Sequence, residues 1–460
     1  MWELQKARGD SEVGTSSGTS VTENRLKKGF WALADQAAVS LGNALTQIIL
    51  ARSLTHSGYG VFALLFGVML LFFTCQGGLI TYPLSLKGAA AEKIELRKLA
   101  FASLILTVLL AVPLSPIVFG AASVLRVATL SWAVILAMLL WQIQETFRRA
   151  LMAHMRHRDA VWGDSLSYLG QAAVLGLLAH RGGMTLERAF LVLAVTSAAA
   201  ALLQSAQLGL SLMPVRKIKS LAREYWSVGR WSLFTNVNGA ASRQAFPWAL
   251  ALLYGPREAA SFVAVMNVLG ASHPVLFSTS NLIVPAAAGA HKKGGIRAAW
   301  DATAHYALMG SAFLMPYLLL LAIWPRVFLS LIYGRLSPYA SFGAGLRLAA
   351  LGYSFGYCAT VVAAFLYGIG RSKLVFTASL GGTALALVPS VVLIAHYRLT
   401  GAIAGLVTLM AGELAVSSIL AKRTLHKEGL WRATASLAPE AGPPSQGQES
   451  RIAVALVSEE

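Results

Sequence analysis

Residues 99–120 have the sequence LAFASLILTVLLAVPLSPIVFG, which contains no charged side chain. In a helix, 22 residues at about 1.5 Å each reach about 33 Å, enough to cross a bilayer core of about 30 Å. The run is continuous and far longer than a membrane β-strand of about ten residues. This stretch therefore predicts a transmembrane helix.

The same pattern repeats along the chain in two sets of six apolar runs. The first set lies at about 29–51, 58–82, 99–120, 128–147, 161–180 and 185–210. The second set lies at about 229–254, 258–286, 303–325, 343–368, 373–396 and 401–421. Only 13% of the 460 residues are charged, whereas soluble domains carry about 25%. We therefore expect an all-α polytopic membrane protein of about twelve transmembrane helices in two six-helix lobes, and a soluble enzyme is excluded.

The formal charge of the chain is +18, and its basic residues are distributed unequally between the two sides of the predicted membrane topology. With the N-terminus inside, 28 of the 38 basic residues, including all 13 lysines, fall in cytoplasmic loops and tails. Eight arginines fall outside, and Arg243 and Arg347 lie within spans. The positive-inside rule accounts for this bias, so both termini are placed in the cytoplasm and no nucleic-acid partner is expected.

The first two spans of each set match each other at an offset of 200 residues. Phe30-Trp31-Ala32-Leu33 aligns with Arg230-Trp231-Ser232-Leu233. Because six is even, both halves enter from the same side, as in a parallel repeat with a cavity between its lobes. The expected parts are a disordered cytoplasmic tail (1–28), a first lobe (29–213), a cytoplasmic linker (214–228), a second lobe (229–421) and a cytoplasmic tail (422–460).

A one-sided polar stripe marks the first span. Gln36, Ser40, Asn43 and Gln47 are spaced i, i+4, i+7 and i+11, with Asp35 beside them. A lipid-facing helix would not keep this stripe, because each unpaired polar group in hydrocarbon costs several kcal/mol. The stripe either lines a cavity or bonds to neighbouring helices.

Arg243 is about 14 residues into the span 229–254, near the bilayer midplane. A charge at that depth costs at least about 2.5–3.5 kcal/mol, so it is expected to face water, a carboxylate or an anionic ligand. The planar guanidinium matches phosphate oxygens. Two interpretations stay open: contact with an anionic substrate group, or an ion pair with Asp35, Asp164 or Glu413.

Other polar residues within spans are less specific. Asp164 is either an interfacial anchor or a proton or cation site, and Glu413 is either a coupling-ion site or a structural carboxyl. Arg52 and Arg347 lie near outer ends, where they snorkel or, if turned inward, extend a basic path from Arg243. The remaining candidates are Asn236 and Asn267 for hydrogen bonding and His273 for packing. The basic segments 148–158 and 216–223 are expected to be solvated in cytoplasmic loops that contact lipid headgroups.

Motifs for catalysis are not found. The chain has no Walker loop, His-Glu-x-x-His, Cys-x-x-Cys or dinucleotide-binding glycine pattern. Its two cysteines, Cys75 and Cys358, support neither a disulfide framework nor a metal site. No enzyme activity, catalytic residue, metal or cofactor is therefore expected.

Several soft motifs resemble a known transporter family. They are Lys28-Gly29-Phe30-Trp31-Ala32-Leu33-Ala34-Asp35-Gln36, Leu50-Ala51-Arg52-Ser53-Leu54, Gly58-Tyr59-Gly60-Val61-Phe62-Ala63-Leu64, Gln144-Glu145-Thr146-Phe147-Arg148-Arg149-Ala150-Leu151, Leu366-Tyr367-Gly368-Ile369-Gly370-Arg371-Ser372-Lys373 and Thr400-Gly401-Ala402-Ile403-Ala404-Gly405. Together they are similar to the polysaccharide-transporter (Wzx-type) flippases of the multidrug/oligosaccharidyl-lipid/polysaccharide superfamily. The resemblance covers about 26–421 and implies the MATE-like fold.

The resemblance implies a flippase of the bacterial inner membrane. Its substrate would be a polyprenyl-diphosphate-linked oligosaccharide, turned from the cytoplasmic to the periplasmic leaflet by alternating access. Arg243, Arg347 and Arg52 would contact the diphosphate, and the sugar hydroxyls would meet Gln36, Ser40, Asn43, Gln47, Asn236 and Asn267. Further partners would be membrane lipids and polysaccharide polymerase or export proteins. Two alternatives remain: a cation-coupled multidrug antiporter, with Asp35, Asp164 and Glu413 as ion-coupling candidates, and a non-transporting subunit or enzyme of polysaccharide assembly.

Overall fold

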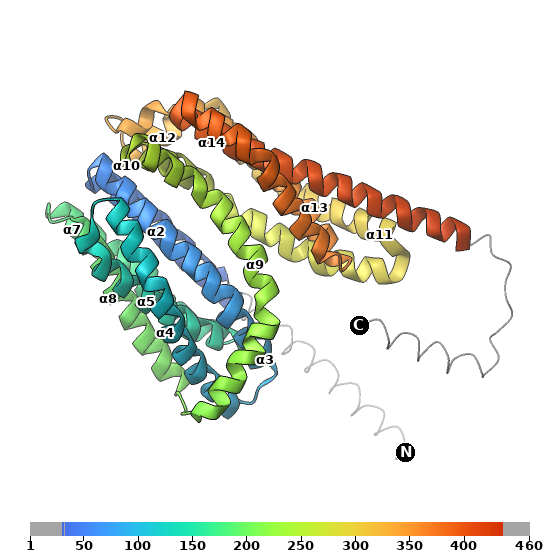
Figure 1. Ribbon diagram of the computed structural model, residues 1–460, viewed down its shortest axis with the longest axis horizontal. Coiled ribbons are helices and arrows are strands. Elements are labelled where there is room, and N and C mark those ends of the chain that lie inside the picture. The colour runs from blue at the N-terminus through green and yellow to red at the C-terminus, as the bar shows by residue number, and fades with distance from the viewer. Residues whose placement is uncertain (1–29, 32, 436–460) are drawn as a thin grey trace, which may run out of the picture.

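The computed structural model describes residues 30–31 and 33–435, without the side chains at 231, 235 and 427–435. The expected tail 1–28 lies outside these residues, as do residues 436–460 of the expected tail 422–460, whereas residues 422–435 are helical. Within that range the chain is helical, with no strand. Two bundles meet beside α10 and α12 and diverge toward their other ends (Figure 1).

The first bundle contains six passes. Residues 33–53 form the first helix. The others are α2 (His56–Gln76) with the π-helical η1 (Gly77–Thr81) and α3 (Tyr82–Ala90), then α4 (Lys93–Val124), α5 (Ser131–Ala153, after the 3-10 turn η2, Ala128–Leu130), α6 (His157–Asp164) with the π-helical η3 (Ser165–Leu169) and α7 (Gly170–His180), and α8 (Leu186–Leu208).

The second bundle also contains six passes. They are α9 (Val215–Tyr254), α10 (Pro256–Gly270) leading into α11 (His273–Ile323), α13 (Gly343–Gly368) and α14 (Ser372–Ala435), with the short α12 (Pro325–Tyr333) and the 3-10 turn η4 (Pro338–Ser341) between α11 and α13. The helices α11 and α14 each provide two passes, because the backbone breaks at Gly295 (φ 74°) and at Arg398 (φ 48°). Twelve passes in two bundles confirm the expected fold class.

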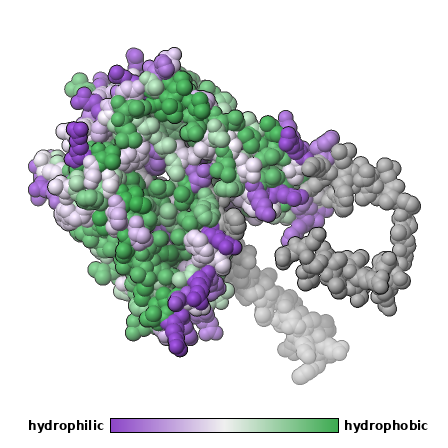
Figure 2. All heavy atoms as spheres, in the orientation of Figure 1, coloured by the Kyte–Doolittle hydropathy of each residue, from purple (hydrophilic) through white to green (hydrophobic). Residues whose placement is uncertain are grey.

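Helix lengths and surface character agree with a membrane environment. Seven helical segments of the described chain are long and apolar enough to cross a bilayer. On the face in Figure 2, hydrophobic residues cover much of both bundles, and hydrophilic residues gather at their ends. The chain is therefore a multi-pass membrane protein by its fold.

The buried core is continuous at one end of the molecule and divided at the other. The largest cluster joins Phe62 and Leu65 of α2 to Val265 of α10 and Leu346 of α13. Two smaller clusters lie apart, one around Leu84, Leu96 and Phe147 and one around Ile296, Phe365 and Leu366. The bundles are thus held together by apolar packing at the end near α10. Toward the other end α9 still packs on the first bundle, and the remaining helices of the two bundles separate (Figure 1).

Three sequence expectations need correction. The segment 148–158 is not a solvated loop, because α5 continues to Ala153 and α6 begins at His157. The segment 216–223 lies in the first turns of α9. The span 258–286 is interrupted after Gly270, where α10 ends, and α11 begins at His273. Apart from the turn at 154–156, both basic segments are helical, and their apolar residues pack on the lobe, as Leu151 and Ile218 do.

Candidate functional site

The exposed polar face of α9 is the first part of the candidate site. Arg243 lies eleven residues before the end of α9, about 16 Å along the helix, which corresponds to the middle of a bilayer core. Its side chain is exposed, and its Nη1 donates to the Gly239 carbonyl of the same helix at 3.2 Å. Within the described chain it forms no ion pair with a carboxylate. The space that Gly239 leaves open accommodates this bond, since a Cβ there would lie 3.4 Å from Nη1.

Side chains on three other helices of the second lobe interact electrostatically with Arg243. Its charge acts on Glu413 of α14, His273 of α11 and Tyr353 of α13. The His273 and Tyr353 rings stack with their centroids 6.1 Å apart, so His273 has the packing contact expected for it. Asn236, about two turns earlier on α9, is exposed and donates to Ser232 Oγ at 3.1 Å. Arg243 therefore lies on a polar face to which several helices contribute.

The first helix divides its polar residues between two environments. Asp35 and Thr46 are buried inside the first lobe, whereas Gln36 is exposed and Ser40, Asn43 and Gln47 are half-buried. Within the stripe, Gln36 Nε2 donates to Ser40 Oγ at 3.2 Å. At its other end, Gln47 accepts a hydrogen bond from the Tyr59 hydroxyl at 3.1 Å. The i, i+4, i+7, i+11 stripe thus borders the lobe surface instead of its core.

Arg52 and Arg347 are engaged with backbone groups. Arg52 donates to the carbonyls of Ile332 (2.7 Å) and Leu331 (2.9 Å) at the C-terminal end of α12. Arg347 donates to the Ala322 carbonyl at 2.8 Å, near the end of α11. Cations at helix C-termini are favourable because the last carbonyls lack intrahelical partners. These contacts cap helices, and no bond in the described chain joins either residue to Arg243.

The lobes are bridged at the end near α10. Asn267 of α10 donates to the Tyr59 hydroxyl at 2.7 Å, and Tyr59 in turn donates to Gln47. The His56 ring lies 3.0 Å from Ser261 Oγ. Tyr339 of the α12–α13 connection packs edge-on against Tyr59, and burial raises the pKa of its phenol. Asn267 is therefore part of an inter-lobe hydrogen-bond chain.

A buried charged cluster in the first lobe was missed at the sequence level. Arg148 of α5, only 7% exposed, donates to Asp35 at 2.7 Å, to Glu145 at 3.4 Å and to Asp164 at a shorter distance. Arg149 pairs with Glu145 at 2.5 Å. Asp164, fully buried at the end of α6, also accepts from Gln144 and Gln204. The candidate ion pairs of Arg243 with Asp35 or Asp164 are absent because Arg148 holds both carboxylates.

Close helix packing brings the members of this cluster together. A Cβ on Gly42 of the first helix would lie 2.6 Å from the Tyr168 Cβ in η3, so the glycine allows the first helix to approach η3. Tyr168 accepts from Trp141 Nε1 at 3.1 Å. The π-helical η3 begins directly after Asp164, and such segments often mark functional sites. A usable sequence signal was the Glu145-x-x-Arg148 spacing, which places both residues on one helical face.

No group of three or more His, Cys, Asp or Glu with metal-binding arrangement occurs in the described part of the chain. Cys75 and Cys358 are free thiols.

Comparison with known proteins places the fold. No protein-family model matches the chain, and no curated protein matches it in sequence. An inward-facing multidrug-resistance MATE-family transporter of the MOP superfamily is 13% identical, with a TM-score of 0.62 over 90% of this chain and 96% of that one. The lipid II flippase MurJ in an inward closed conformation is 10% identical, with a TM-score of 0.67 over 85% and 87%. A MOP-superfamily transporter from Pyrococcus furiosus is 13% identical, with a TM-score of 0.59 over 86% and 93%. The chain thus has the MATE-like fold, a coarser assignment than the Wzx-type family expected from its motifs.

Proposed function

We propose that this protein is a flippase that moves a polyprenyl-diphosphate-linked oligosaccharide from the cytoplasmic to the periplasmic leaflet of a bacterial inner membrane. The observation that carries the proposal is Arg243, an exposed cation at mid-span without a carboxylate partner in the described chain. Such a residue is costly unless it meets water or an anion. A diphosphate supplies the anion that a guanidinium binds in bidentate fashion.

The surrounding polar groups fit the sugar part of that substrate. Gln36, Ser40, Asn43 and Asn236 carry amide and hydroxyl groups on exposed or half-buried positions. These groups donate and accept hydrogen bonds without charge, as sugar hydroxyls require. Asn267, Gln47, Arg52 and Arg347 are already bonded between helices, and we assign them to the closed end of the transporter instead of the substrate. The polyprenyl tail stays in lipid in this proposal.

A cation-coupled multidrug antiporter is the second candidate, and one observation favours it. The buried cluster contains three carboxylates, Asp35, Glu145 and Asp164, against two arginines, Arg148 and Arg149. The excess of one carboxyl group over the arginines suits a proton or a monovalent cation as coupling ion. The exposed face of α9 argues against cationic drugs, because Arg243 would repel them. Glu413, half-buried near Arg243, is the coupling candidate of the second lobe.

The test is transport by full-length protein in liposomes. Wild-type protein is expected to turn a fluorescent polyprenyl-diphosphate oligosaccharide between leaflets, and Arg243→Gln is expected to reduce the rate at least about tenfold. Arg335→Gln is the matched control, because Arg335 is an exposed arginine in the α12–α13 connection, outside the candidate site. Arg243→Lys keeps the charge and is expected to retain part of the rate.

Each other outcome counts against the proposal. Transport of a cationic dye driven by a proton or sodium gradient, without movement of the glycolipid, would favour the antiporter. No transport of either compound by well-folded protein would favour a non-transporting subunit or enzyme of polysaccharide assembly, for which polymerase and export proteins are the expected partners. Equal rates for Arg243→Gln and Arg335→Gln would remove Arg243 from the substrate path.

A further inference from the structure

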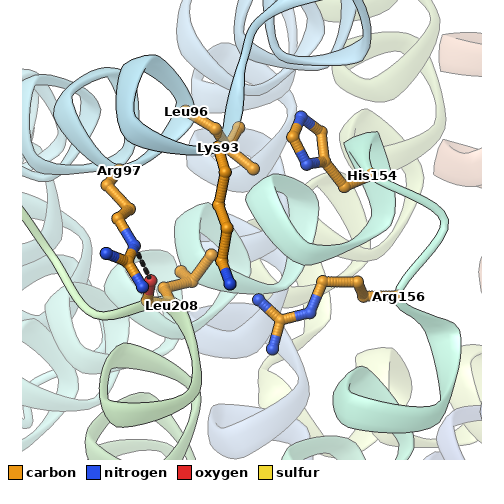
Figure 3. A pocket seen from close by; sticks show the side chains of 6 residues that line it. All are labelled: Lys93, Leu96, Arg97, His154, Arg156 and Leu208. Carbon is orange, nitrogen blue, oxygen red and sulfur yellow. Dashed lines mark hydrogen bonds between the residues drawn. The ribbon is translucent and has the colours of Figure 1, made fainter.

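A basic cavity lies at the end of the first lobe where the bundles separate. Its volume is about 350 Å³, within the range of small-ligand pockets. The lining residues come from the start of α4, the turn between α5 and α6, and the end of α8 (Figure 3): Lys93, Leu96, Arg97, His154, Arg156 and Leu208.

The lining is cationic and carries no carboxylate. Arg156 is paired with Asp159, with Nε 2.7 Å from the carboxylate. The Lys93 ammonium forms no ion pair in the described chain, and Arg97 donates a single bond, to the Leu208 carbonyl at 2.9 Å. Two of the three permanent charges are therefore uncompensated. In Figure 3 the Lys93 and Arg156 side chains extend toward one another across the cavity.

Backbone carbonyls hold the basic groups in place. Arg156 Nη2 donates to the Gln207 carbonyl at 3.0 Å, and the His154 ring lies 2.9 Å from the Ala91 carbonyl. Arg97 lies beside Gly209, whose φ is +64° and where a Cβ would be 3.2 Å from Nη2. These contacts fix Arg97 and Arg156 before any ligand binds, so less ordering of these two side chains is needed on binding than for freely moving surface lysines.

The local backbone adds positive potential. The 32-residue α4 begins at Lys93, and its N-cap residue, Glu92, makes no side-chain capping bond. The first backbone N–H groups of the helix therefore lack a side-chain acceptor, and the helix dipole favours an anion there. Glu95 in the same turn offsets part of this potential, so an anion near Lys93 gains mainly from the ammonium.

The position suits a lipid. The predicted topology places this end of the lobe at the cytoplasmic face, where anionic lipids attract basic residues. Ile94, 60% exposed, follows Lys93, and Met155, 53% exposed, stands between His154 and Arg156. Apolar side chains beside a basic pocket are expected where a headgroup and its acyl chains are both in contact. Leu96 and Leu208 supply an apolar wall inside the cavity.

We propose that this cavity binds the phosphate of an anionic glycerophospholipid headgroup, with Lys93, Arg97 and Arg156 as its cations. The site is separate from Arg243 and from the proposed substrate path. It would fasten the starts of α4 and α6 and the end of α8 to the membrane surface, because one headgroup contacts all three.

Native mass spectrometry of the full-length protein in detergent tests the proposal, with phosphatidylglycerol and phosphatidylcholine as probes. Wild-type protein is expected to bind phosphatidylglycerol at least about tenfold more tightly than phosphatidylcholine. The double variant Lys93→Gln, Arg97→Gln is expected to lose about tenfold in phosphatidylglycerol affinity. The control is Lys217→Gln, Lys219→Gln, which removes two exposed charges from α9 outside the cavity. Arg97→Lys, which keeps the charge, is expected to retain binding within about threefold.

Three results would overturn the proposal. Equal loss in the cavity variant and the α9 control would show that total charge, not the cavity, attracts lipid. Glycerol 3-phosphate or inorganic phosphate could stabilise the wild-type protein as much as phosphatidylglycerol does, and the cavity variant could lose this effect. That result would assign the site to a soluble phosphate instead of a lipid. Equal affinity of the wild-type protein for phosphatidylglycerol and phosphatidylcholine would show that the cavity does not select an anionic headgroup.

Discussion

Replacing Arg148 by Met tests the energetics of the buried cluster. The side chain is 7% exposed and donates to three buried carboxylates, one of them Asp35 at 2.7 Å. Methionine fills much of the same volume but leaves Asp35 and Asp164 without a cation. Removing one partner of a buried ion pair costs about 3–5 kcal/mol, because an uncompensated charge remains. At about 2–4 °C per kcal/mol for a unit of 150–250 residues, the size of the first lobe, we expect the unfolding temperature to fall by at least about 6 °C.

The assay is thermal unfolding of the detergent-purified protein, followed by tryptophan fluorescence. Trp141, hydrogen-bonded to Tyr168 beside the cluster, makes this signal sensitive to the first lobe. Arg149→Met is the matched control, since Arg149 is one residue away on the same helix but its side chain is 41% exposed. When Arg149 is removed, Glu145 keeps its contact with Arg148 at 3.4 Å, and a pair with one partly exposed partner contributes about 0–1 kcal/mol, so we expect a decrease of at most about 4 °C.

A second variant separates the loss of charge balance from the loss of packing. Adding Asp164→Asn to Arg148→Met removes one of the orphaned carboxylates while keeping an acceptor for Gln144 and Gln204. We expect the double variant to recover several degrees. The reasoning is refuted if Arg148→Met unfolds within 2 °C of Arg149→Met, or if the double variant is less stable than Arg148→Met alone.

Two further predictions concern contacts between the lobes. Gly78→Ala is expected to destabilise the protein by about 1–3 kcal/mol, because the new Cβ would lie 2.8 Å from the Leu233 backbone of α9. The control Gly77→Ala, whose Cβ would have no atom within 4 Å, should unfold at or slightly above the wild-type temperature. Equal unfolding temperatures of the two variants would contradict this prediction. Arg52→Gln is expected to remove about 1 kcal/mol of stabilisation from the C-terminal end of α12, after allowance for the exposure of the Arg52 side chain. Amide hydrogen exchange in α12, measured by mass spectrometry, should then become about fivefold faster. Unchanged exchange would show that Arg52 does not stabilise this helix.

Hydropathy was enough to predict the passes, because each one must satisfy its backbone internally and present apolar side chains to lipid. The apolar run 99–120 lies inside α4, as expected. Helix ends were less predictable. Arg148 was assigned to a loop because hydropathy falls after residue 147, yet α5 continues for six residues with Ala150 and Leu151 fully buried.

The charged cluster depends on contacts that no local pattern encodes. Arg148 contacts Asp35, which is 113 residues earlier in the chain. It also contacts Asp164, which lies at the end of α6, beyond the turn that follows α5. The sequence showed that each carboxylate was costly within its span, but not which cation would meet it. For Arg243 the same cost argument was sufficient to single out the residue, and the structure adds that its side chain is exposed.

The charged cluster also distinguishes the two halves of the chain. All four of its members, Asp35, Glu145, Arg148 and Asp164, belong to the first set of spans, and the residue at the offset of 200 from Asp35 is the uncharged Thr235. The first lobe therefore has an electrostatic lock among its own helices. A chimera built from two first halves would carry two such locks, and one built from two second halves would carry none.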